Sequence, residues 1–153
     1  MTNLILEESK DSISVIDLNM FMEEFNLKLP ESYIEFILKN NGGYPDKSIF
    51  YSENLDLKFD IDFFYSINSS YNDKNVLESL DDLVTVNEMI NNYQIEEKEL
   101  ESFLYPFGQN SGGTTYCISM REIDFGSILL HYWDGSDLQF ITNSFTDFIN
   151  RLK

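Results

Sequence analysis

The sequence has a single cysteine, Cys117, and a single histidine, His131. One cysteine can form neither an intrachain disulfide nor the cysteine-rich ligand set of a structural zinc site. No apolar run approaches the ~20 residues that span a bilayer, and the first residues lack the basic and apolar regions of a signal peptide. We therefore expect a protein of the reducing cytoplasm that neither spans nor enters a membrane.

Basic residues are also scarce: 10 Lys and Arg stand against 27 Asp and Glu, giving a net charge of −17 and a pI near 4.1. Binding to nucleic-acid phosphates or to an anionic membrane surface needs clustered Lys and Arg, so both are excluded as functions. The excess of acidic residues does not indicate a disordered chain, because 13 Phe and 9 Tyr supply material for a hydrophobic core. A length of 153 residues predicts one domain over residues 1–153, and the charge favours a basic partner.

Two helices are predicted near the N-terminus, because apolar residues recur there at intervals of three and four. Residues 17–26 form the first stripe, with Ser14 or Asp17 as the N-cap. Residues 29–43 form the second, with Pro30 at the first helical position and Gly42 in the left-handed conformation that ends a helix. The two stripes comprise Leu18, Phe21, Met22, Phe25, Leu29, Tyr33, Phe36 and Ile37.

After the two predicted helices, apolar residues recur at every second position. Residues 55–63 alternate apolar and charged side chains without a fault, which predicts one half-buried strand, and residues 48–51 predict a strand before it. Later strands are expected near 115–120, 128–133 and 138–141, the last two joined at an Asp-Gly turn. A central helix from Ser79 and a C-terminal helix capped by Ser144 complete the pattern. This order predicts an α+β fold: a mostly antiparallel sheet of about five to six strands, flanked by N-terminal, central and C-terminal helices.

Three segments of the sequence form a recognisable series: LPESYIEFILKNNGGYP, LYPFGQNSGGTTYCISM and ILLHYWDGSDLQFITNSFTDFINRL. They resemble the SUKH superfamily, which contains fungal glucan-synthesis-regulator-like proteins and many bacterial immunity proteins, and the resemblance covers about residues 14–152. The resemblance implies an α+β fold without an active site and, for bacterial members, the neutralisation of a toxin by binding. It also implies scaffold roles for the motif residues Leu29, Pro30, Tyr33, Phe36, Asn41, Gly42 and Gly43.

Few combinations of residues in this sequence could form a catalytic or metal-binding site. Cys117 and His131 form a nucleophile–base pair only if their strands pair so that the two residues face each other, and a lone strand cysteine is usually a small buried hydrophobe. The GQNSGG segment lacks the Gly-Lys-Ser/Thr ending of a phosphate loop, which favours a turn. Asp60 and Asp62 lie too far apart along a strand to share a metal ion readily. We expect no enzyme, no catalytic or metal site and no cofactor, although the sequence alone leaves a hydrolase open.

The acidic residues of the 55–63 strand, Asp56, Asp60 and Asp62, admit two interpretations. They are either a solvated face that discourages edge-to-edge aggregation or a docking face for a basic protein. The hypothesis favoured here is an immunity protein that occludes a cognate basic toxin, expected to be a nuclease. The alternative is a non-catalytic regulatory or small-ligand- or protein-binding scaffold of the glucan-synthesis-regulator type. Besides those three acids, the candidate partner-binding residues are Asp81, Asp82, Tyr132, Trp133, Asp134 and Asp137, with Tyr65 and Tyr71 as further aromatic candidates.

Overall fold

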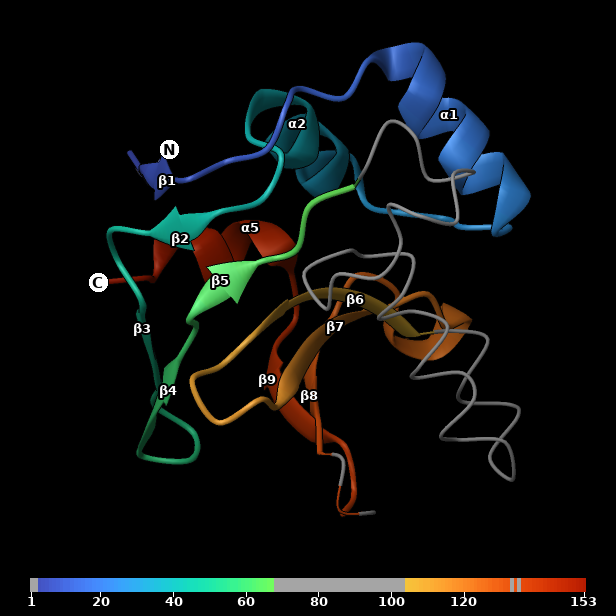
Figure 1. The fold of residues 1–153 in the computed structure, drawn as a ribbon. Helices are drawn as coiled ribbons and strands as arrows, with labels where there is room; N and C mark the ends of the chain where they lie inside the picture. The colour runs from blue at the N-terminus through green and yellow to red at the C-terminus, as the bar shows by residue number, and fades with distance from the viewer. Residues whose placement is uncertain (1–2, 68–103, 133, 135) are drawn as a thin grey trace.

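A five-stranded antiparallel sheet forms the centre of the molecule in the computed structural model, which describes residues 3–67, 104–132, 134 and 136–153 (Figure 1). Its strands lie in chain order, so each pairs with the next. They are β5 (Phe63–Phe64), β6 (Leu104–Gln109), β7 (Thr115–Ser119), β8 (Ile128–His131) and β9 (Gln139–Thr142). The α+β class with an antiparallel sheet is therefore confirmed.

Helices and two small two-stranded sheets surround this sheet. The described helices are α1 (Val15–Glu24), α2 (Glu31–Lys39) and α5 (Phe145–Asn150), together with a single 3-10 turn, η1 (Glu122–Asp124). β3 (Ile49–Ser52) and β4 (Leu57–Asp60) form a hairpin, whereas β1 (Leu6–Glu7) pairs with β2 (Tyr44–Pro45) across the two N-terminal helices. The helix expected from Ser79 lies outside the described residues.

The predicted helix starts are found where side-chain oxygens cap them. The amide of Asp17 donates to Ser14 Oγ at 3.1 Å, and the amide of Asp147 donates to Ser144 Oγ at 3.0 Å. The predicted end of α2 is wrong. The helix stops at Lys39 and Asn40 is already extended, so Gly42 lies beyond the helix and Pro30 serves as the N-cap instead of the first helical residue.

The expected continuous strand over 55–63 is also wrong. Residues 53–56 form the turn between β3 and β4, with Asp56 at φ +50°, so Leu55 and Leu57 are 39% and 53% exposed. After Asp60 the chain leaves β3, and Phe63–Phe64 joins β6 in the main sheet. The alternation of apolar and charged residues nevertheless continues through the turn and the change of partner strand. The reason is that Phe59 in the hairpin, Ile61 after it and Phe63 in the main sheet all pack against the same core.

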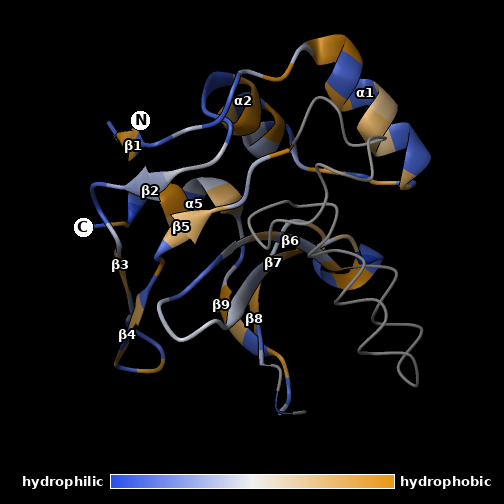
Figure 2. Ribbon diagram, in the orientation of Figure 1, coloured by the Kyte–Doolittle hydropathy of each residue, from blue (hydrophilic) through white to orange (hydrophobic). Residues whose placement is uncertain are grey.

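Aromatic side chains fill the space between α5 and the sheet. Phe107 of β6 meets Phe145 and Phe148 of α5 edge-on, with ring centroids 5.4 and 5.6 Å apart. Phe148 also stacks on Phe50 of β3 at 5.4 Å. Hydrophobic residues accordingly mark β5, β9 and α5 (Figure 2). These contacts fix α5 between the main sheet and the β3–β4 hairpin.

The Asn-Gly-Gly segment joins α2 to the sheet. Asn41 is buried, and its Nδ2 donates to the carbonyl oxygens of Asp11 and Ile67, both at 2.7 Å, while the Ile67 amide donates to its Oδ1 at 2.8 Å. Gly43 and Phe64 exchange both backbone hydrogen bonds, at 3.1 and 2.9 Å. Asn41 and Gly43 therefore connect the chain after α2 both to the segment at Asp11 and to the segment from Phe64 to Ile67.

Candidate functional site

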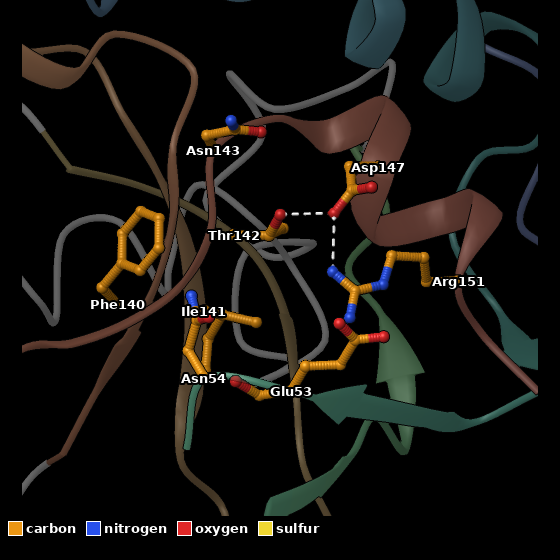
Figure 3. A pocket seen from close by; sticks show the side chains of 9 residues that line it. Glu53, Asn54, Phe140, Ile141, Thr142, Asn143, Asp147 and Arg151 are labelled. Atoms are coloured by element: carbon orange, nitrogen blue, oxygen red, sulfur yellow. Dashed lines mark hydrogen bonds and ion pairs between the residues drawn. The ribbon is translucent and has the colours of Figure 1, made fainter. Parts of the chain in front are cut away.

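A polar groove lies between the β3–β4 turn, β9 and α5, and we call it the β3/β9 groove. Its volume is about 350 Å³. Nine side chains from these three elements line it, and Figure 3 shows them as sticks. They are Ser52, Glu53, Asn54, Phe140, Ile141, Thr142, Asn143, Asp147 and Arg151.

A hydrogen-bonded network forms the floor of this groove. Asp147 Oδ2 accepts from Thr142 Oγ1 of β9 and from Arg151 Nη1, the latter at 3.1 Å. Arg151 Nη2 donates to the Tyr51 carbonyl at 2.7 Å, and the guanidinium carbon lies 4.6 Å from the centre of the Phe50 ring. A half-exposed ion pair is worth only about 0.5 kcal/mol. The main effect of the network is to hold β3, β9 and α5 at fixed positions around the groove.

The rim of the groove is exposed and carries an acid and an aromatic ring. Glu53 is exposed and forms no ion pair within the described residues, and Phe140 is 46% exposed. Figure 3 shows the Arg151 guanidinium between Asp147 and Glu53. The lining thus holds two carboxylates and one guanidinium, so it has a net negative charge.

The three acids predicted as one docking face have different surroundings. Asp56 lies in the β3–β4 turn and accepts a short hydrogen bond from the Tyr51 hydroxyl, which raises the pKa of that tyrosine. Asp60 Oδ2 accepts from the Ser111 amide at 2.9 Å, so this half-buried carboxylate holds the β6–β7 loop. Asp62 is exposed beyond the end of β4. The single acidic strand face that we expected therefore does not form.

The predicted residues between β8 and β9 lie on an exposed loop. Asp134 and Asp137 are exposed, whereas Tyr132 is half-buried. Asp134 Oδ1 accepts hydrogen bonds from the Ser136 side chain and, at 2.9 Å, from the Ser136 amide, and these bonds lower the pKa of Asp134. Trp133, Tyr71, Asp81 and Asp82 lie outside the described residues, and Tyr65 is buried.

Sequence reasoning missed Glu53 and Phe140, the two rim residues of the β3/β9 groove. A signal existed for Phe140, because it is followed directly by Ile141 in a strand. Adjacent strand residues point to opposite faces, so at a strand that is covered on one face only, one of two neighbouring apolar residues is exposed. Ile141 is buried and Phe140 is exposed. Glu53 gave no such signal, since an acid in a turn is ordinary.

The strand register places Cys117 and His131 on the same face of the sheet but two residues out of direct opposition. Cys117 pairs with Leu129 and His131 pairs with Thr115, so the two residues do not face each other directly. Cys117 is fully buried, and burial raises the pKa of its thiol far above neutrality. A thiolate nucleophile is the reactive form of cysteine, and this environment disfavours it.

We predict that native Cys117 resists alkylation. At pH 8, iodoacetamide should modify the folded protein at least about 100-fold more slowly than the urea-unfolded chain, because reaction needs both thiolate and access. Mass spectrometry over time measures both rates. Equal rates for the folded and unfolded protein would contradict the buried, protonated thiol.

The remaining sequence candidates form structural features. In GQNSGG, Asn110 Oδ1 accepts from the amides of Gly112 and Thr114 at 3.0 and 2.8 Å, which closes the β6–β7 turn. Over the described ranges, no three His, Cys, Asp or Glu side chains gather as metal ligands would. Within those same ranges no helix is both long and apolar enough to cross a bilayer.

Comparison with known proteins identifies the family. The sequence profile of the SMI1/KNR4 family (SUKH-1) matches residues 12–151, which is most of the chain. A search of curated proteins finds no match. The profile covers α1, α2, the complete sheet and α5. The chain therefore belongs to the SMI1/KNR4 (SUKH-1) family.

Proposed function

We propose that this protein is an immunity protein that binds a cognate basic toxin, expected to be a nuclease, and neutralises it by stoichiometric occlusion in the cytoplasm. The family includes immunity proteins as well as SMI1/KNR4 regulators. The observation that carries the proposal is the uncompensated negative charge. The sequence has 27 acids against 10 bases, and the described residues form only two ion pairs, Arg121–Asp124 and Arg151–Asp147.

Such a surface suits a partner of opposite charge. A nuclease holds phosphates in a positively charged groove, and exposed carboxylates can occupy that groove in their place. Long-range attraction raises the rate of encounter, while the affinity depends on desolvated contacts at the centre of the interface. Exposed acids such as Glu53, Asp62, Asp134 and Asp137 would steer the toxin, and an exposed aromatic such as Phe140 would anchor it.

We predict a strong salt dependence of toxin binding. Raising NaCl from about 50 to about 500 mM should lower the association rate constant at least about ten-fold, because salt screens charges beyond a few ångströms. The dissociation rate constant should change less. Stopped-flow mixing with the cognate toxin measures both constants, and association rates that are equal at the two salt concentrations would contradict electrostatic steering.

Family membership also supports the alternative of a regulatory scaffold. Co-expression separates the two functions. An immunity protein should rescue cells from the toxin encoded beside it and co-purify with that toxin at a one-to-one ratio. Failure of both tests against the adjacent gene product would overturn the immunity proposal and favour the scaffold.

A further inference from the structure

We infer that the β3/β9 groove receives an arginine side chain of the partner, held between the Glu53 carboxylate and the Phe140 ring. This inference rests on the proposed function and names the point of contact within it. The residues that carry it come from two segments far apart in the sequence, 52–54 and 140–143, which the fold brings together in the lining of one groove.

The charge of the lining selects a cation. An entering anion would face the carboxylates of both Glu53 and Asp147. The only guanidinium in the lining, Arg151, already donates to Asp147 and to the Tyr51 carbonyl and lies over the Phe50 ring. Arg151 thus neutralises one of the two carboxylates and is oriented by its bonds to Asp147 and Tyr51, so the lining as a whole keeps a net negative charge. A cation gains from Glu53 and from the negative charge of the whole protein.

The size and chemistry of the groove suit a side chain with a flat cationic end. A volume of about 350 Å³ is at the small end for ligand sites, which fits one long side chain and a few waters. A guanidinium can bond a carboxylate through two parallel N–H groups and stack on an aromatic face at the same time. Glu53 and Phe140 provide these two groups, and the exposed amides of Asn54 and Asn143 add acceptor oxygens nearby.

Within the described part of the chain, no strand pairs with the outer edge of β9. β9 is the last strand in the order of the described five-stranded sheet, and its residues 140–142, together with Asn143 that follows, line the groove. A partner backbone can therefore approach along the outer edge of β9 while one of its side chains enters the groove. An arginine carried on a protein surface matches this geometry better than a free metabolite, which would be held by an enclosed cavity.

The direct test uses a small probe. Amide NMR spectra of the labelled protein are recorded with N-acetyl-arginine amide and, as the matched control, with N-acetyl-citrulline amide, whose side chain has a similar shape but no charge. We expect shifts at Glu53, Asn54, Ile141 and Asn143 with the arginine compound only. Glu53→Gln should reduce these shifts about three-fold, as expected for an exposed ion pair. Equal effects of the two compounds, or shifts independent of Glu53, would overturn the inference.

The second test uses the toxin. Glu53→Gln and Phe140→Ala should each raise the Kd about ten-fold. Glu31→Gln and Ile123→Ala, an exposed acid on α2 and an 89% exposed apolar residue on η1, should leave it unchanged. A toxin that binds wild type and all four variants equally overturns the groove inference but leaves the proposed function standing. A toxin that does not bind wild type at all overturns the proposed function, and the inference with it.

Discussion

Replacing Gly42 with alanine is expected to destabilise the fold by about 3 kcal/mol or more, enough to lower the urea midpoint markedly. Gly42 has φ +75°, where an alanine costs roughly 1–2 kcal/mol. Its added Cβ would also lie 2.8 Å from both the Phe64 carbonyl oxygen and the Ser66 amide nitrogen. Those atoms belong to the backbone beside the main sheet, so the clash can be relieved only by separating α2 from β5, which costs roughly 1–3 kcal/mol more.

Two other glycines provide controls that separate backbone strain from collision. Gly113 has φ +84° with no atom near the position of a Cβ, so Gly113→Ala should destabilise by only about 1–2 kcal/mol. Gly112 has neither feature, and Gly112→Ala should be within about 0.5 kcal/mol of wild type. If Gly42→Ala and Gly113→Ala were equally destabilising in urea unfolding, the collision of the added Cβ with the Phe64 and Ser66 backbone would contribute nothing to the free energy of unfolding.

The second large effect is expected at Asn41. Asn41→Ala removes the partners of three backbone groups, the carbonyls of Asp11 and Ile67 and the amide of Ile67. Asn41 is 4% exposed, so water cannot readily replace its amide. A buried polar group left without a partner costs about 1–3 kcal/mol, and the total loss should be about 3 kcal/mol because Asp11 can reach solvent.

The neighbouring asparagine is the matched control for this change. Asn40 is half-buried and forms no side-chain hydrogen bond among the described residues. Asn40→Ala should therefore change the free energy of unfolding by less than about 1 kcal/mol. Hydrogen exchange adds a local measurement, because Asn41→Ala should speed exchange of the Ile67 amide before global unfolding. Unchanged exchange at Ile67 would show that the Asn41 side chain does not hold this strand end.

Local signals predicted the parts of the fold that depend on neighbouring residues. The serine caps of α1 and α5 were correct because an N-cap hydrogen bond joins residues only three apart. The order of the later strands was correct because consecutive antiparallel strands need only short connections. The end of α2 was predicted wrongly. Asn41 lies beyond the helix, where its side chain bonds to the carbonyls of Asp11 and Ile67, and no local sequence pattern shows these long-range contacts.

The candidate site could not be predicted because three separate segments build it. Glu53 belongs to a turn whose position is set by the pairing of Ser52 with Leu57, and the alternating pattern concealed that turn. Phe140 reaches the same groove only because Arg151 and Asp147 tie α5 to β3 and β9. The charge of the chain supports the kind of partner that we propose, whereas the proposed place of contact depends on tertiary structure.

The succession of β6, β7, β8 and β9 has a consequence for how the chain folds. These four strands pair with their immediate neighbours in sequence, so their hairpins require only short loops to close and can form early. β5 joins β6 through Phe64 and Gly108, which are separated by a long stretch of chain, and this closure loses more chain entropy. We expect the four-strand meander to be largely assembled in the transition state and the attachment of β5 to complete folding afterwards.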